Sequence, residues 1–363
     1  MNHDKLTIRE LRARPVLVPM QRPLVTSGGA VDAAPLVLVD LFTEEGVQGC
    51  SYVFCYTPAA LEPMALLLKK IGESLAGERV APLALDELLQ KKFRLLGAQG
   101  LIGMALAGID IAAWDALARA AALPLVRFLG GEARPIPAYN SNGLGIIGPE
   151  RAAAEALELA EPGFGAVKVR LGYPDVASDI AVVRAVRNTV GDDILLMSDF
   201  NQTLSPAEAQ TRVAHLDDEG LYWIEEPTRA DDYDGHAQIC ATSRTPIQLG
   251  ENCWGPHDMD KALTAGSCDL FMPDVVKIGG VTGWLRAAAL AEARAMPVSS
   301  HLFPELSAHL LAITPTRHWL EYVDWANPIL AQPIAIEDGN AIIPDAPGHG
   351  MAWDEDAVRK YMR

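Results

Sequence analysis

The stretch AVKVRLGYPDVASDIAVVRAVRNTVGDDILLMSD (residues 166–199) decides the fold. Two short apolar runs, AVKVR and LLMSD, enclose a segment rich in alanine, valine and charged residues that follows a Gly/Pro turn. Strands that alternate with helices in this way indicate a parallel sheet. The pattern recurs outward along residues 133–326, in the runs IPAYNS, AVKVR, LLMSD, YWIE, IQLGE, LFMPD, PVSSH and HWLE. Eight such runs predict a closed barrel of the (β/α)₈ kind.

The segments on either side of this region have a different character. Within residues 1–132, the apolar runs at 16–18 and 36–42 (LVLVDLF) are typical of strands, and an alanine-rich helical stretch ends at Pro124 and at Gly130-Gly131. This part is predicted to be an α+β unit with a mostly antiparallel sheet. Residues 327–363 are punctuated by proline and glycine, and we expect them to pack back on the barrel or on the first unit.

Composition excludes several classes of function. The 363 residues include 30 Lys and Arg against 47 Asp and Glu, a net charge of −17. A nucleic-acid partner and an anionic membrane surface both require a basic patch, so neither is expected. No run of 18 apolar residues occurs, and the start MNHDKLTIRE lacks an apolar signal segment. The five cysteines form no CxxC motif, which indicates free thiols in a cytoplasmic protein.

Ionisable side chains fall at the ends of the predicted strands. Lys168 lies within AVKVR, and the following runs end in Asp199, Glu225, Glu251, Asp274, His301 and Glu321. The carboxyl ends of barrel strands surround one mouth, where active sites are found. We therefore expect these side chains to converge although they are far apart in the sequence.

Two groups within this set predict chemistry. The carboxylates of Asp199, Glu225 and Glu251 on successive strands would repel one another without a cation, and a set of oxygen ligands favours Mg²⁺. Glu226 follows Glu225 directly, so strand alternation should turn it away from the mouth, where it would either contact the ligands from behind or form an ion pair. His301 with Asp274 one strand earlier suits a general base whose imidazole is oriented by a carboxylate.

Seven motifs carry a resemblance to a known family. They are Lys168-Val-Arg170, SDFNQ (198–202), WIEEP (223–227), GEN (250–252), MPDVVKIGGVTGW (272–284), SSHLF (299–303) and HWLE (318–321). In this order and spacing they resemble the enolase superfamily and, within it, the mandelate racemase subgroup. The resemblance implies an N-terminal α+β capping domain (1–132), a modified TIM barrel of the (β/α)₇β kind (133–326) and a C-terminal segment (327–363).

The resemblance also implies roles for individual residues and a form of assembly. Asp199, Glu225 and Glu251 would bind Mg²⁺, and His301 with Asp274 would remove the proton α to a carboxylate. Lys168 would neutralise that carboxylate, and a protonated Glu321 would hydrogen-bond its other oxygen. The residues that would contact the substrate are Ser141, Asn201, Val25, Val31, Tyr56 and Leu302. A homo-oligomer, such as an octamer, and a small 2-hydroxycarboxylate as substrate are implied as well.

Arg170 departs from the family pattern and leaves three hypotheses open. Racemases of this subgroup have Lys-x-Lys, and the second lysine is the base on the face opposite the histidine. Deprotonating arginine at pH 7 would cost on the order of 9 kcal/mol, which places two-base racemisation in doubt. A racemase-like isomerase of a 2-hydroxy acid remains the first hypothesis. An acid-sugar dehydratase, with His301 as both base and acid and Arg170 binding substrate, is the second. A metal-binding barrel without catalysis is the third.

Overall fold

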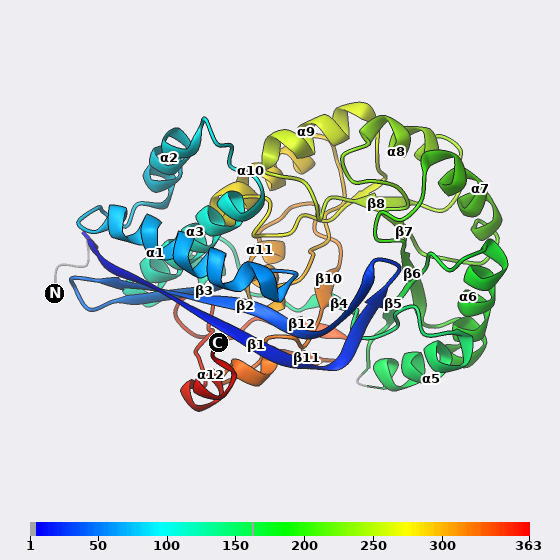
Figure 1. Cartoon of the computed structure of the whole chain (residues 1–363), viewed down its shortest axis with the longest axis horizontal. Helices are drawn as coiled ribbons and strands as arrows, with labels where there is room; N and C mark the ends of the chain where they lie inside the picture. The colour runs from blue at the N-terminus through cyan, green and yellow to red at the C-terminus, as the bar shows by residue number, and fades with distance from the viewer. Residues whose placement is uncertain (1–4, 162) are drawn as a thin grey trace.

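The computed structural model describes residues 5–161 and 163–363, which form a capping domain beside a barrel (Figure 1). Three antiparallel strands make the sheet of the capping domain, in the order β1-β2-β3. The elements of this domain are β1 (Ile8–Thr26), β2 (Gly29–Thr43), β3 (Gln48–Phe54), η1 (Pro58–Ala60), α1 (Leu61–Leu75), α2 (Pro82–Phe93), α3 (Gly100–Ala120) and α4 (Leu125–Phe128). The predicted α+β character of this part is confirmed.

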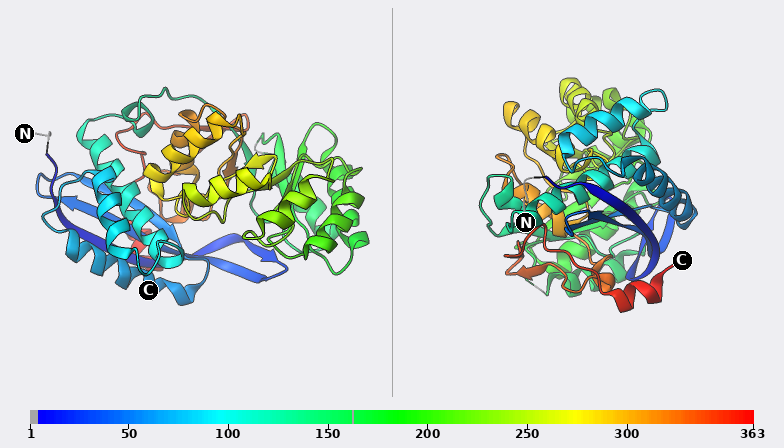
Figure 2. Two further views of the ribbon diagram at one scale, coloured as in Figure 1. Left: turned by 90° about the horizontal axis from the view of Figure 1, so that it is seen from above. Right: turned by 90° about the vertical axis from the view of Figure 1, so that its left-hand side faces the viewer.

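The first two strands are much longer than the predicted runs. They form a hairpin that leaves the capping sheet and reaches across to the barrel (Figures 1 and 2). The sequence of β1 contains three prolines, at positions 15, 19 and 23. Proline has no backbone N–H to donate to a neighbouring strand, so these residues argue against a long strand. The pairing tolerates them through a register shift between Pro19 and Leu24.

Helix α3 is the core of the capping domain. It packs against β3, where Gly49 comes so close that a Cβ atom would lie 2.0 Å from the carbonyl oxygen of Ala112. By length and composition α3 could cross a membrane, but 72% of its apolar window is buried inside the protein. A buried position of this kind is what a core helix requires.

The barrel alternates strands and helices as predicted. Its elements are β4 (Ile136–Asn140), α5 (Pro149–Ala160), β5 (Ala166–Arg170), α6 (Val176–Val190), β6 (Leu195–Asp199), α7 (Pro206–Leu216), β7 (Ile224–Glu225), α8 (Tyr233–Cys240), β8 (Ile247–Leu249), α9 (Pro256–Ala265), β9 (Leu270–Phe271), α10 (Gly280–Ala293), α11 (Pro304–Ala312) and β10 (Leu320–Tyr322). Within the opening stretch, α6 begins at the capping residue Asp175, whose side chain accepts from the Ser178 amide, and ends at Gly191 with a positive φ of 78°.

Parallel pairing from β4 to β9, with β10 paired to β4, makes the wall of the barrel. The remaining gap is bridged by residues 298–301, which pair with Phe271 and Asp274 on one side and with Arg317 on the other. Seven strand–helix units and a final strand therefore close the wall, which is the predicted (β/α)₇β arrangement.

The C-terminal segment contacts both parts of the molecule. It contains η2 (Asn327–Ile329), β11 (Ala335–Glu337), β12 (Asn340–Ile342) and α12 (Glu355–Tyr361). Strand β12 extends the barrel sheet antiparallel to β4, and Met362 forms a bridge with Val16 of the capping domain.

A buried polar cluster of Cys50, Asp115 and His349 fastens the C-terminal segment to the capping domain. Asp115 accepts from the backbone amides of Cys50 and His349, both at 2.9 Å. The two ring nitrogens of His349 contact the Cys50 carbonyl oxygen at 2.7 Å and the Met351 amide at 3.2 Å. Although the three side chains are close enough to hold a metal ion, both histidine nitrogens are already hydrogen-bonded. We interpret the cluster as a structural hydrogen-bond network that holds the C-terminal segment against the capping domain. All five cysteines are free.

Candidate active site

Three buried carboxylates meet at the mouth of the barrel. Asp199 and Glu225 end β6 and β7, and Glu251 follows β8. Each of them offers an oxygen within 4.8 Å of the others. Burial, together with repulsion from Asp199 and Glu251, raises the pKa of Glu225 to about 8 despite the neighbouring Lys168. Such a set of crowded oxygen donors fits a hard divalent cation.

Lys168 extends from β5 into the same cluster. Its Nζ lies 2.9 Å from Glu225 Oε2 and 2.8 Å from Glu321 Oε1. Burial opposes the charge of this amine, but the surrounding carboxylates raise its pKa overall. The same contacts affect Glu321: although burial favours its neutral form, Lys168 and His301 lower the pKa of Glu321 to about 2. The protonated Glu321 implied by the resemblance stays a prediction.

His301 and Asp274 lie side by side as predicted. His301 Nδ1 is 2.8 Å from Asp274 Oδ2, and its Nε2 faces Glu251 Oε2 at 3.1 Å. Two backbone amides, of Val276 and Lys277, donate to the other oxygen of Asp274 and fix that carboxylate. Burial lowers the pKa of His301, but Glu251, Glu321 and Asp274 raise it overall. The dyad thus presents one imidazole edge, Nε2, to the centre of the carboxylate cluster.

The guanidinium of Arg170 is held by the loop that follows β4. Its Nη1 donates to the carbonyl oxygens of Ser141 and Gly143 at 2.8 and 3.0 Å, and its Nη2 contacts Ser141 Oγ at 2.9 Å. The side chain therefore holds the loop after β4. Ser141, expected at the substrate, is fully buried against this guanidinium and does not line the cavity.

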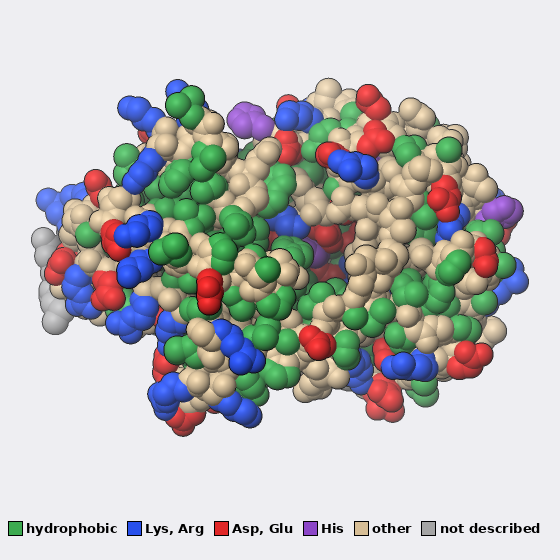
Figure 3. Space-filling view, in the orientation of Figure 1, with side chains coloured by type: hydrophobic (Ala, Val, Ile, Leu, Met, Phe, Trp, Pro, Cys, Tyr) green, Lys and Arg blue, Asp and Glu red, His purple; other side chains and the backbone are tan. Residues whose placement is uncertain are grey.

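A cavity of about 620 Å³ lies over the carboxylates. In Figure 3 acidic and histidine side chains are visible at the bottom of a hollow in the middle of this face. The polar floor comes from the barrel, with Lys168, Arg170, Asp199, Asn201, Gln202, Glu251, Asn252, Lys277, His301 and Glu321. The capping domain adds a largely apolar wall, with Leu24, Thr26, Val31, Phe54, Cys55, Tyr56, Leu101 and Met104.

The structure brings most of the expected contact residues to this cavity. Asn201, Val31, Tyr56 and Leu302 line it, and the Asn201 side chain donates to Asp199 Oδ2 at 2.8 Å. Val25 does not line it, because alternation along β1 sends the flanking Leu24 and Thr26 inward instead. The resemblance implied a contact residue in a loop at this position, whereas Val25 lies near the end of β1.

Residues around the mouth adopt a left-handed backbone conformation that is uncommon outside glycine. They are Tyr56, Asn201, Gln202, Glu226, Leu302 and Phe303, with φ between 35° and 65°. Conformations of this kind cost of order 1–3 kcal/mol each and gather at functional sites. Their concentration here supports the assignment of the cavity as the active site.

Lys277 and Asn252 were given no role by the sequence interpretation, and they form a chain of hydrogen bonds with Glu226. Lys277 Nζ donates to Asn252 Oδ1 at 2.7 Å, and Asn252 Nδ2 donates to Glu226 Oε2 at 2.7 Å. Glu226 forms no ion pair among the described residues, but Asn252, which donates to it, also donates to Glu251 Oε1 at 3.1 Å. Glu226 therefore contacts a candidate ligand from behind, through Asn252, which was the other expectation. Its positive φ of 35° ends the strand alternation. Lys277 and Asn252 stand inside quoted motifs, but the sequence does not show that they point toward one another.

Behind the mouth, Glu305 provides a pH-dependent contribution to stability. Its Oε2 accepts from the Tyr52 hydroxyl at 3.0 Å, and burial raises its pKa from 4.5 to about 7. The folded state therefore holds the Glu305 proton more tightly than the unfolded chain does. The contribution of Glu305 to the free energy of unfolding falls as the pH rises from about 4.5 to 7. The free energy of unfolding of wild type should therefore fall, relative to that of Glu305→Gln, by roughly 1.4 kcal/mol per pH unit between pH 4.5 and 7.

The measurement is urea unfolding of both proteins at pH 5 and pH 8. Glu292→Gln, at an exposed position, is the matched control and should follow wild type at both values. A free-energy difference between Glu305→Gln and wild type that is the same at the two pH values would contradict the assignment.

Comparisons with known proteins bear on these observations. The N-terminal domain family of mandelate racemase and muconate lactonizing enzyme matches residues 8–130, and the enolase C-terminal domain-like family matches residues 151–357. A solved enolase from Bradyrhizobium, complexed with magnesium and mandelic acid, is 47% identical with a TM-score of 0.94 and covers 99% of both chains.

Two further relatives extend the comparison. An enolase from alpha proteobacterium bal199 with bound magnesium is 47% identical, has a TM-score of 0.97, and covers 99% of this chain and 100% of its own. L-talarate/galactarate dehydratase from Salmonella typhimurium LT2 is 30% identical over 95% of this chain and 85% of its own length.

Proposed function

The chain belongs to the mandelate racemase/muconate lactonizing enzyme family of the enolase superfamily, and we propose that it removes the proton α to the carboxylate of a 2-hydroxy acid. Members of this superfamily are Mg²⁺-dependent, and solved relatives contain bound magnesium. The observation that carries the proposal is the arrangement of the His301–Asp274 dyad beside three converging carboxylates at one cavity.

Asp199, Glu225 and Glu251 are the residues that would hold the ion. Their donor atoms are all carboxylate oxygens, and the crowding that raises the pKa of Glu225 is relieved by a divalent positive charge. When bound, Mg²⁺ supplies the charge that stabilises the enediolate formed after proton loss.

The remaining chemistry is assigned to side chains of this chain. Asp274 orients the imidazole of His301 so that Nε2 faces the reacting centre and accepts the α-proton. The buried ammonium of Lys168 provides a fixed positive charge for the substrate carboxylate. Asn201, on the cavity wall, is placed to hydrogen-bond a substrate oxygen.

The walls of the cavity favour a particular class of substrate. Leu24, Val31, Phe54, Leu101 and Met104 face the polar floor across the cavity. An apolar wall suits an aryl or alkyl substituent and offers few partners for the hydroxyl groups of a sugar acid. The mandelic acid in the related Bradyrhizobium structure belongs to this class. We therefore propose a monocarboxylate with an apolar substituent.

Arg170 leads to a stereochemical prediction. Its guanidinium donates hydrogen bonds to the loop after β4, and a guanidinium cannot readily take a proton from carbon. Proton removal therefore depends on His301, on one face of the substrate. Wild-type enzyme should exchange the α-proton of one enantiomer at least about 100-fold faster than that of the other. Deuterium uptake from D₂O into each enantiomer of mandelate, followed by NMR, measures this ratio. Comparable exchange from both enantiomers would contradict the one-base proposal.

A dehydratase is the second candidate, and the single base favours it. His301 could remove the α-proton and return it to a leaving β-hydroxyl, so no base on the opposite face is required. Similarity to L-talarate/galactarate dehydratase supports this alternative. Incubation with galactarate and Mg²⁺ distinguishes the two: a 2-keto product supports dehydration, and exchange of mandelate supports the first proposal. Neither reaction with any tested acid would favour a barrel without catalysis.

A further inference from the structure

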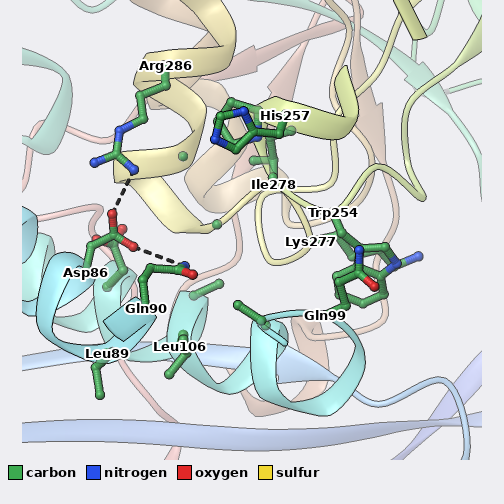
Figure 4. Close-up of a pocket in the computed structure, with 18 of the residues that line it drawn as sticks. Asp86, Leu89, Gln90, Gln99, Leu106, Trp254, His257, Lys277, Ile278 and Arg286 are labelled. Atoms are coloured by element: carbon green, nitrogen blue, oxygen red, sulfur yellow. Dashed lines mark hydrogen bonds and ion pairs between the residues drawn. The ribbon is translucent and has the colours of Figure 1, made fainter. Parts of the chain in front are cut away.

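One indole ring stands between the candidate active site and a second cavity. The second cavity, of about 780 Å³, lies between helices α2 and α3 of the capping domain and the loops that follow β8 and β9 (Figure 4). Trp254 and Lys277 line this cavity and also line the candidate active site. These two side chains therefore form a shared wall.

The position of Trp254 is fixed from both domains. On the barrel side, its backbone amide donates to Asp258 Oδ2 at 3.1 Å, at the start of α9. On the capping side, the ring lies against α3, where a Cβ atom added to Gly103 would be only 3.4 Å from the ring atom Cε3. The indole thus spans the gap between the two domains. Met104, the next residue of α3, lines the active site.

Lys277 forms the other part of the wall. Its ammonium lies 4.3 Å from the centre of the Tyr56 ring and is hydrogen-bonded to Asn252. The side chain is 6% exposed. Because Lys277 is held from two directions, Trp254 is the part of the wall whose removal would open a passage without disturbing the contacts of Asn252.

The second cavity has the character of an apolar pocket. Leu85, Leu89, Leu106 and Ile278 contribute to its lining. Four of the charged side chains in its lining form two ion pairs, with Arg286 2.7 Å from Asp86 and Lys261 2.9 Å from Asp258. The buried Asp110, also in the lining, accepts from Thr282. Figure 4 shows Asp86 and Arg286 at the side away from Trp254. An aromatic ring is a better match to this interior than an ion.

We propose that Trp254 sets the length limit of the apolar substituent on the substrate. In wild type the substituent ends against the indole, and without the indole it would continue into the second cavity. The inference rests on the proposed function, because it assumes that the carboxylate end of the substrate lies on the polar floor.

The test compares two substrates that differ by one ring. The proposal places the ring of mandelate within the first cavity and the outer ring of its 4-phenyl homologue in the second. In Trp254→Ala, the ratio of kcat/KM for deuterium exchange, homologue over mandelate, should rise about tenfold or more over wild type. Trp325→Ala is the matched control, because Trp325 lines the active site and does not line the second cavity. Its ratio should stay near that of wild type.

Several outcomes would overturn the inference. An unchanged ratio in Trp254→Ala would do so, as would an equal rise in Trp325→Ala. If Trp254→Ala does not fold, Trp254→Leu removes most of the ring and should raise the ratio in the same direction. If wild type exchanges neither acid, the proposed function fails by itself. In that case, binding of the homologue in the presence of Mg²⁺ is measured by calorimetry. Binding to Trp254→Ala that is about tenfold tighter than to wild type supports the proposed role of Trp254, and equal affinity for the two proteins refutes it.

Discussion

We expect His301→Asn to abolish exchange of the substrate α-proton with solvent for every acid that the enzyme accepts. The asparagine amide can fill part of the imidazole volume but cannot accept a proton from carbon. General-base catalysis contributes about 10²–10⁴-fold, so the residual rate should lie at or below detection. The measurement is deuterium uptake from D₂O by NMR with saturating Mg²⁺.

Asp274→Asn should give a partial loss through the same imidazole. Asp274 Oδ2 accepts a hydrogen bond from His301 Nδ1, and an amide in its place weakens that bond without removing the base. His257→Asn is the control, since His257 is exposed and lines the second cavity, and it should match wild type. Exchange that persists in His301→Asn would place the base elsewhere.

Removing Mg²⁺ should abolish activity and lower the melting temperature together. Without a divalent ion, the repulsion among Asp199, Glu225 and Glu251 is offset only by neighbouring side chains, chiefly Lys168 and His301. A ligand present at 100 times its Kd stabilises the folded state by about 2.7 kcal/mol. Thermal unfolding and turnover, each measured with excess Mg²⁺ and with chelator, check the prediction.

A variant tests which residues bind the ion. Glu251→Gln replaces one anionic donor with a neutral one and should weaken Mg²⁺ binding measured by calorimetry. Asp260→Asn, a change of the same kind in helix α9 and outside the cavity lining, should leave the affinity unchanged. Chelated enzyme with unchanged melting and turnover, or equal Mg²⁺ affinity in Glu251→Gln and wild type, would argue against this metal site.

The barrel could be predicted from the sequence because its strand ends carry chemistry at a regular interval. Each run from AVKVR to HWLE occupies a strand or strand-like segment of the barrel wall, and the ionisable residues that end them meet at one mouth. Strand order and burial follow from local patterns, so this part of the site required no knowledge of long-range contacts.

What the sequence could not predict depends on where side chains point in irregular segments. Arg170 lies on a strand, but its partners Ser141 and Gly143 are in a loop whose course no periodicity describes. Glu226 leaves the strand alternation through one left-handed residue. Val25 lies in β1 rather than in a loop, because the hairpin of β1 and β2 continues past the prolines through a register shift. In each case the outcome was set by tertiary contacts rather than by local preference.

The fastening of His349 to Asp115 affects the order of events during synthesis of the chain. These residues are 234 positions apart, and Cys50, whose carbonyl also contacts His349, is 299 positions away from it. Domains generally fold as units, beginning at the N-terminus as the chain emerges from the ribosome. Here the capping domain contains a buried carboxylate whose hydrogen-bond partner His349 is translated only after the whole barrel. A nascent chain that stalls within the barrel would therefore have a capping domain that lacks this contact.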